Sequence, residues 1–153
     1  MDLGIIQLDK PDQIGIVVRS VDQFVDRFKA LFNITGFEII DWPIPGTDPD
    51  STYHGVKAVW KMRTAFITLG SLQIEIVEPL EGNSIYKDFL SKNGPGLHHI
   101  RFTVTDFENK IVSLQKAGIE MISSGKGMRT NSRWAYFDTF DLLDGVYIEL
   151  RTV

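Results

Sequence analysis

The amino-acid sequence contains the same pattern of residues twice. One copy starts at Gln13 and reads QIGIVVRSVDQFVDRFKALF, and the other starts at His99 and reads HIRFTVTDFENKIVSLQKAG. When Gln13 is aligned with His99, Ile14 falls on Ile100, and apolar positions continue to match along both segments. Because a repeated sequence pattern folds into repeated structure, the chain is expected to form two similar halves.

A second pair of matching segments comes later in each copy. The segment LQIEIVEP carries Glu75, and the segment VYIELRTV carries Glu149. The chain has 153 residues, which is the length of one domain. We therefore predict a single domain over residues 1–153, built from module one at about 11–80 and module two at about 96–153.

Each module is expected to run strand, helix, strand, strand, strand. The expected strands lie at 13–18, 37–40, 56–69 and 72–78, and then at 98–104, 119–123, 134–140 and 146–153. The helices follow the N-cap residues Ser20 and Asp106, and a short helix at 85–92 links the modules. The apolar face of the first helix is expected to comprise Val21, Phe24, Val25, Phe28, Leu31 and Phe32. This order predicts an α+β fold in which two modules pair, because one helix covers only one face of a four-stranded sheet.

Strand alternation places four polar side chains on the sheet face that the helices leave bare. The apolar residues of four strands share one face, and the opposite face carries, strand by strand, Gln13, Glu75, His99 and Glu149. Their oxygen and nitrogen atoms suit a divalent cation. The alternative is a solvated sheet face on which polar residues alternate without a chemical role. His98 has the parity of the apolar Ile100 and is expected to be structural.

Composition excludes several classes of function. The sequence has no cysteine, so it has neither disulfides nor thiolate metal sites. A net charge of −4 argues against nucleic acid as a partner. No signal peptide and no membrane-spanning segment are recognised, which favours a cytoplasmic location. Sheet edges left after the modules pair predict a homodimer.

Two loops are candidates for contact with a small-molecule substrate. The segment 41–55 is rich in proline and glycine and carries the large rings of Trp42 and Tyr53, which either serve a function or pack on the surface. The segment 124–133 contains Lys126, Arg129 and Arg133. Arg129 and Arg133 are candidates to bind a carboxylate or phosphate of the substrate, and a solvated basic loop is the alternative.

The segments NGPGLHHIRFTV, QIEIVEP and GVYIEL, together with the paired modules, resemble the vicinal-oxygen-chelate superfamily. This superfamily includes glyoxalase I, methylmalonyl-CoA epimerase, ring-cleaving dioxygenases and bleomycin-resistance proteins, and methylmalonyl-CoA epimerase and glyoxalase I are the most similar members. The resemblance implies an open, half-barrel-like metal-binding cleft whose ligands are Gln13, Glu75, His99 and Glu149. Gln13 replaces the histidine of the epimerases, whereas some glyoxalases I have the same Gln-Glu-His-Glu set. No second carboxylate is present near Thr64, where the epimerases tend to have one.

The resemblance also implies a reaction. A divalent ion (Co, Ni, Mn, Mg or Zn) holds a carbonyl or thioester oxygen, and Glu149 removes the proton from the neighbouring carbon. The expected activity is that of a metal-dependent isomerase, epimerase or lyase, acting on an acyl-CoA thioester or on the thiol adduct of a 2-oxoaldehyde. The alternative is a protein of the same superfamily that binds and sequesters a small molecule without reaction.

Overall fold

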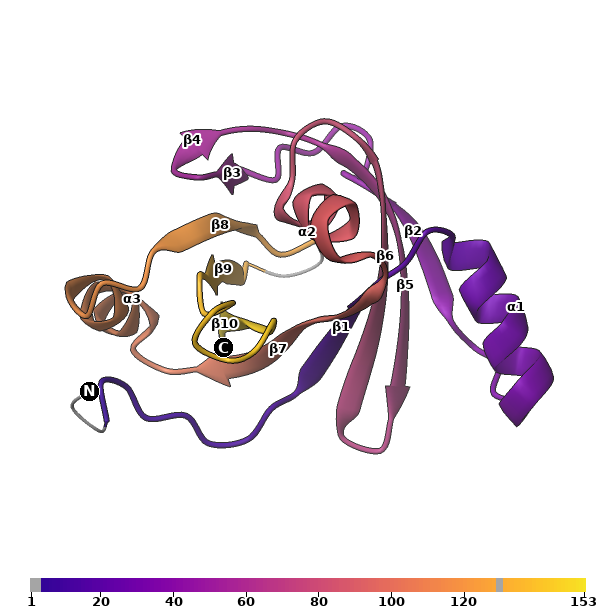
Figure 1. Cartoon of the computed structure of the whole chain (residues 1–153), viewed down its shortest axis with the longest axis horizontal. Coiled ribbons are helices and arrows are strands. Elements are labelled where there is room, and N and C mark those ends of the chain that lie inside the picture. Colours follow the sequence, from indigo (N-terminus) through magenta and orange to yellow (C-terminus); the bar gives the residue numbers. More distant parts are fainter. Residues whose placement is uncertain (1–3, 129–130) are drawn as a thin grey trace.

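The computed structural model describes residues 4–128 and 131–153, and it shows the predicted strand and helix order in module two and the same order with two additional short strands, β3 and β4, in module one (Figure 1). Module one contains β1 (Gln13–Val17), α1 (Val21–Phe32), β2 (Glu38–Trp42), β3 (Thr52–Tyr53), β4 (Val56–Lys57), β5 (Lys61–Leu69) and β6 (Leu72–Glu81). The linker helix is α2 (Ile85–Asn93). Module two contains β7 (Gly96–Val104), α3 (Phe107–Lys116), β8 (Met121–Lys126), β9 (Arg133–Phe137) and β10 (Tyr147–Thr152).

The two modules join edge to edge in one mixed sheet. Within the described residues its strand order is β2-β5-β6-β1-β7-β10-β9-β8-β3-β4. β1 pairs with β7 in antiparallel fashion at the centre, and each of them has a parallel neighbour, β6 and β10 respectively. The sheet curls into a half-barrel, as predicted, with α1 and α3 at opposite sides of the view (Figure 1). The four strands that carry the candidate ligands are therefore consecutive neighbours.

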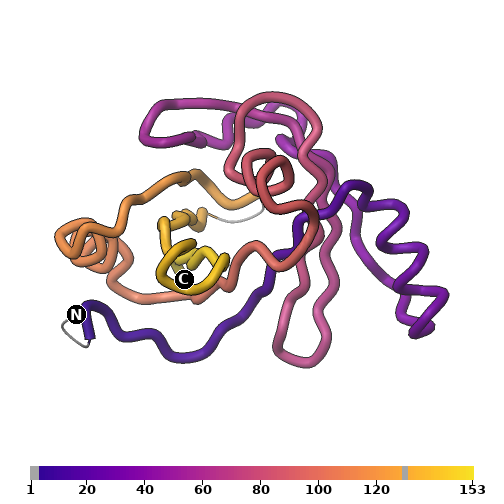
Figure 2. Tube along the Cα trace, in the orientation of Figure 1, coloured from indigo at the N-terminus to yellow at the C-terminus, as the bar shows by residue number. Residues whose placement is uncertain are grey.

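Apolar clusters hold the helices against this sheet. Val21 of α1 packs with Ala65 and Ile76, and the apolar face of α3 packs with Phe137 and Leu150. A third cluster lies between α2 and the strands and contains Trp42, Trp60, Met62, Tyr86, Phe89 and Tyr136. The chain before β1 runs beside module two (Figure 2), where Ile5, Ile6 and Leu8 pack against the α3 cluster. The aromatic cluster fills one part of the concave side of the sheet and leaves room for a pocket beside it.

The helix starts agree with the predicted caps at one of two positions. The Ser20 hydroxyl accepts a hydrogen bond from the Gln23 amide at 3.2 Å. Asp106 does not cap through its side chain, because its backbone is left-handed (φ 56°) and its carboxylate instead accepts from Asn109 Nδ2. The last turn of α1 also departs from prediction, since Leu31 is 73% and Phe32 60% exposed. Only the N-terminal part of this helix is held firmly against the sheet.

The segment 41–55 belongs to module one in sequence, but part of it pairs with a strand of module two. The predicted strand 56–69 is split into β4 and β5, and the β3–β4 hairpin turns at His54 and Gly55, both with positive φ. β3 pairs with β8 of module two. The Tyr53 hydroxyl donates to Asp88 of α2, and the ring of Trp42 is buried in the aromatic cluster. Both rings are thus packed, and the hairpin extends the sheet of the other module.

Candidate functional site

The four predicted donors meet at one point on the concave face of the sheet. Nε2 of His99 lies 3.2 Å from Oε2 of Glu75 and 3.3 Å from Oε2 of Glu149. Oε1 of Gln13 lies 3.1 Å from the same nitrogen. All four side chains are buried, and His99 is 0% exposed. Strand parity and the repeat predicted that these residues share a face, and the adjacency of β6, β1, β7 and β10 brings them together.

Gly15 makes room for the imidazole ring of His99. In the register of β1 and β7, Gly15 stands opposite His99, and a Cβ atom added at Gly15 would lie 1.9 Å from Cε1 of the ring. Real Cβ contacts are never that short, so a side chain at this position would displace the ring. Sequence reasoning placed Gly15 on the correct face but did not recognise that the ring requires a glycine there.

His98 is buried, as expected of a structural residue, but it also contacts the cluster, which its parity did not predict. The pairing of β1 with β7 shifts between Gly15 and Ile16, which adds one residue on β7 and turns His98 towards α2. Its ring packs against Tyr86, Phe89 and Tyr147, and its Nδ1 lies 2.9 Å from Nδ1 of His99. Complete burial lowers the pKa of His98 well below the usual histidine value, so the ring is neutral. If His99 donates in this bond, its Nε2 presents a lone pair to the carboxylates, which is the form that a metal ligand needs.

Burial of the carboxylates controls the electrostatics of the cluster. Loss of solvent raises the pKa of Glu149 to about 7, although His99 and Arg101 oppose the shift and Tyr136 donates a hydrogen bond to the carboxylate. The Arg101 guanidinium donates to Asp12 at 2.6 Å, and Asp12 also accepts from the Thr103 amide. Arg101 therefore supplies a fixed positive charge near the two glutamates.

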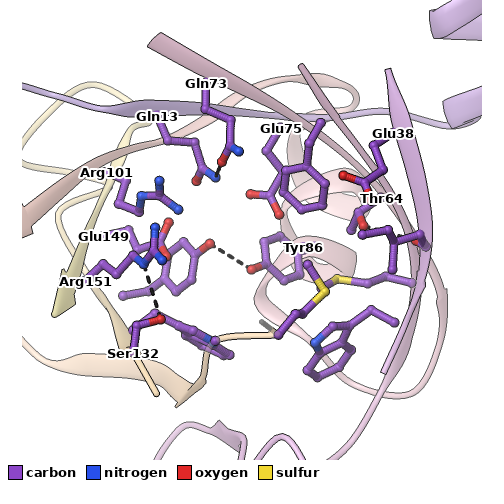
Figure 3. Close-up of a pocket in the computed structure, with 18 residues that line it drawn as sticks. Gln13, Glu38, Thr64, Gln73, Glu75, Tyr86, Arg101, Ser132, Glu149 and Arg151 are labelled. Carbon is purple, nitrogen blue, oxygen red and sulfur yellow. Dashed lines mark hydrogen bonds between the residues drawn. The ribbon is translucent and has the colours of Figure 1, made fainter. Parts of the chain in front are cut away.

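A pocket of about 200 Å³ opens beside the cluster. Its lining includes Gln13, Glu38, Trp42, Met62, Thr64, Phe66, Gln73, Glu75, Tyr86, Arg101, Met128, Ser132, Trp134, Tyr136, Glu149 and Arg151. In Figure 3 Gln13, Arg101 and Glu149 lie on one side of the pocket, and Glu75, Thr64 and Glu38 on the other. Parity places Arg101 and Arg151 on the same face as His99 and Glu149 of their strands, and Tyr136 stands directly opposite Glu149 on the neighbouring strand. No local signal marks Tyr86, which comes from α2.

The predicted basic residues lie away from this pocket. Arg133 donates to Glu108 of α3 at 2.6 Å, and its guanidinium lies over the ring of Phe107. Arg133 also lines an adjoining groove with Lys126, and this groove shares Trp42 and Met128 with the pocket. Arg129 lies outside the described residues. Arg101 and Arg151 are the arginines that line the pocket among the residues that the structure describes.

The donor set fits a divalent cation in its chemistry. Ligands about 2.1 Å from an ion and at right angles to each other lie about 3 Å apart, which is close to the separations from His99 Nε2 given above. Within residues 4–128 and 131–153, no group of three His, Asp or Glu side chains is arranged around a position for an ion. Hydrogen bonding within the cluster favours turning the Gln13 amide, so that its oxygen accepts from Arg101 Nη1 at 3.0 Å. A cation would instead favour the oxygen facing His99.

Comparison with known proteins identifies the family. Residues 12–137 match the Glyoxalase/Bleomycin resistance protein/Dioxygenase superfamily, and the chain belongs to this superfamily. The chain is 31% identical over 143 residues to the protein YqjC of Bacillus subtilis, described as uncharacterized, with 94% of this chain and 91% of that protein covered. It is 35% identical over 116 residues to an ethylmalonyl-CoA/methylmalonyl-CoA epimerase of Cereibacter sphaeroides, which covers 75% of each chain.

A solved structure shares the fold. The crystal structure of methylmalonyl-CoA epimerase from Mycobacterium tuberculosis superposes with a TM-score of 0.65 at 23% identity, covering 95% of this chain and 88% of that one. No helix within residues 4–128 and 131–153 has the length and apolar character needed to cross a membrane.

Proposed function

We propose that this protein is a metal-dependent isomerase or epimerase, or a lyase, that removes a proton from the carbon next to a carbonyl or thioester. The convergence of Gln13, Glu75, His99 and Glu149 on one buried point beside a pocket is the observation that carries the proposal. The 35% identity to an ethylmalonyl-CoA/methylmalonyl-CoA epimerase supports an acyl-CoA thioester as the substrate. The Gln-Glu-His-Glu set equally suits the thiol adduct of a 2-oxoaldehyde.

Gln13, Glu75, His99 and Glu149 would hold the cation through two carboxylates, one amide oxygen and one imidazole nitrogen. A divalent ion bound there supplies positive charge for the substrate oxygen on which negative charge develops. Arg101 adds a second, permanent positive charge on the same side of the pocket, fixed by its hydrogen bond to Asp12.

Glu149 is the residue that we assign as the base. Burial raises its pKa to about 7, and a general base works best when its pKa lies near the operating pH. In this assignment the carboxylate of Glu149 takes the proton from the substrate carbon. The reaction is completed when a proton is added to the opposite face of that carbon, in an epimerase, or to the neighbouring carbon, in an isomerase or lyase. The pocket would limit the access of water to the carbanion that forms when the proton is removed, because its lining includes the apolar side chains of Trp42, Met62, Phe66 and Trp134.

The groove next to the pocket would accommodate the part of the substrate that does not react. A pocket of about 200 Å³ suits a small acyl group but not a whole acyl-CoA. The adjoining groove is lined by Lys126 and Arg133, which can bind a phosphate of the thiol portion. In this proposal Arg133 binds substrate away from the reacting carbon, as does Arg129 in the same segment.

The test is exchange of the substrate α-hydrogen with D2O, followed by NMR, on methylmalonyl-CoA and on the methylglyoxal–glutathione adduct side by side. Co²⁺-loaded protein should exchange one of them, and Glu149→Gln should slow that exchange by at least about 10²-fold. Glu81→Gln is the control, because this exposed carboxylate on β6 lies outside the pocket and should leave the rate unchanged.

Elemental analysis tests the metal independently. Substoichiometric metal in carefully purified protein, with no thermal shift on adding Co²⁺, Ni²⁺, Mn²⁺ or Zn²⁺, would argue against the enzyme. Tight binding of a substrate without any exchange would instead indicate a sequestering protein.

A further inference from the structure

The two glutamates of the site face different aromatic residues on their neighbouring strands. Across β5 and β6, Phe66 stands directly opposite Glu75. Across β9 and β10, Tyr136 stands directly opposite Glu149. These are equivalent places in the two modules, and both rings line the pocket. A phenol hydroxyl is therefore present next to Glu149, and the corresponding ring next to Glu75 has none.

Hydrogen bonds direct the proton of Tyr136 towards Glu149. The Tyr86 hydroxyl donates to the Tyr136 oxygen at 2.9 Å, so the single proton of Tyr136 remains for a different acceptor. The Glu149 carboxylate stands directly across the strand pair as an acceptor for this proton, and hydrogen bonding with Tyr136 lowers the pKa of Glu149. Nε2 of His99 lies 3.5 Å from the same hydroxyl, at the long end of the hydrogen-bond range.

Both phenols are held rigidly by their surroundings. Tyr86 and Tyr136 are buried, and their rings meet edge to face with centroids 5.8 Å apart. Tyr86 also packs against Trp60 and His98, and Tyr136 against Trp134 and His99. The hydroxyl of Tyr136 thus has a fixed position on a packed wall, and it is connected through Tyr86 to helix α2.

We propose that Tyr136 is a positioning residue that holds the Glu149 carboxylate in place and makes Glu149, rather than Glu75, the working base. The inference rests on the proposed function and extends it. A carboxylate that accepts a hydrogen bond from a fixed phenol loses rotation about its last torsion, which keeps its second oxygen directed at the substrate carbon. Phe66 cannot restrain Glu75 in this way. Of the two glutamates at equivalent positions, Glu149 is therefore the base, held by a hydrogen bond, and Glu75 serves only as a metal ligand.

The test uses the Co²⁺-loaded protein and α-hydrogen exchange of methylmalonyl-CoA in D2O. Tyr136→Phe should lower kcat by about 10-fold or more, the usual effect of losing a group that orients a site residue, with KM within about twofold of the parent. Co²⁺ affinity, measured by calorimetry, should fall by less than kcat does, because Gln13, Glu75 and His99 do not depend on this hydrogen bond. Phenylalanine is tolerated at the equivalent place in module one, so Tyr136→Phe is expected to fold.

Two further variants separate positioning from general damage. Tyr86→Phe removes an equally buried hydroxyl one step further from Glu149, and it should lower kcat by less than about threefold. In a Glu149→Gln background, Tyr136→Phe should cause no additional loss, because the group through which it acts is already altered. A full multiplicative loss in that background, an unchanged kcat in Tyr136→Phe, or an equal loss in Tyr86→Phe would each overturn the inference.

The hydrogen bond between Tyr136 and Glu149 can also be tested if the protein has no exchange activity. If the parent exchanges neither methylmalonyl-CoA nor the methylglyoxal–glutathione adduct, the tether is tested by thermal unfolding of the single and double variants of Tyr136 and Glu149. A hydrogen bond between the two predicts that the double variant shifts the melting temperature by less than the sum of the single shifts. Additive shifts would show that no tether exists.

Discussion

Replacing Glu149 by glutamine should change how the stability of the metal-free protein depends on pH. Glu149 is buried on β10 beside the pocket, and its pKa is raised to about 7, chiefly by loss of solvent. In the unfolded chain the same carboxyl is solvated and has a pKa of 4.5. The native state therefore binds the proton more tightly than the unfolded state does.

The sign and size of the effect follow from this difference. A raised carboxyl pKa contributes stability that is fully present below 4.5 and is lost as the pH rises through about 7. A difference of about 2.5 pKa units corresponds to about 3 kcal/mol, of which roughly 2.5 kcal/mol is lost between about pH 5 and about pH 8. Glutamine cannot titrate, so Glu149→Gln should lack this part of the pH dependence.

Urea unfolding with a chelator at pH 5 and pH 8 measures the effect. On that pH change the parent should lose about 2.5 kcal/mol more of its free energy of unfolding than Glu149→Gln does. The exposed Glu81→Gln should behave like the parent. Identical pH dependence in the parent and in Glu149→Gln would refute the claim that burial suppresses ionisation of this carboxyl. Adding Co²⁺ at pH 8 should restore stability to the parent, because a cation compensates the buried charges.

Four other predictions concern the remaining parts of the molecule. Gly15→Ala should weaken Co²⁺ binding by at least about 10-fold in calorimetry, because its Cβ would lie 1.9 Å from the His99 ring, whereas Gly96→Ala on β7, with open space around its Cβ, should not. His99→Ala should lose Co²⁺ first and exchange activity as a consequence, so retention of full metal content would contradict its role as a ligand. Arg133→Ala should raise the KM for methylmalonyl-CoA with little change in kcat, and an unchanged KM would remove the groove from the proposal. Sedimentation should show a homodimer at micromolar concentration, and a monomer would disprove the predicted assembly.

Much of the fold could be predicted because its information is local and repeated. Strand parity and helix periodicity identified the order of elements in both modules apart from the short strands β3 and β4, and Ser20 was correctly identified as a cap. The pairing of β3 with β8 could not be predicted, because a two-residue strand inside a proline-rich segment has no distinguishing pattern. The exposed last turn of α1 was missed for a related reason. Periodicity shows that Leu31 and Phe32 share a face, but it does not show how far the sheet extends beneath that face.

In the candidate site, too, some residues could be predicted from the sequence and others could not. The convergence of the four donors could be predicted because each lies on the bare face of its strand at a matching place in the repeat, and their role as metal ligands stays a prediction. Parity could also have shown that Arg133 lies outside the pocket, since Trp134 and Tyr136 line the pocket and Arg133 alternates with them along β9. His98 could not be placed from parity, because a bulge in β7 interrupts the alternation. A bulge depends on the partner strand, which the local sequence does not reveal.

The central strand pair shows why a duplicated fold does not have a symmetric site. In the register of β1 and β7, His99 faces Gly15 and Gln13 faces Arg101, and the two pairs are equivalent under the repeat. The imidazole requires a glycine opposite, because any side chain there would occupy the volume of the ring. The smaller amide of Gln13 leaves room for the long side chain of Arg101 on the partner strand. Each first-strand donor is therefore coupled to the residue across from it, so a histidine at position 13 would require a smaller residue at position 101 as well.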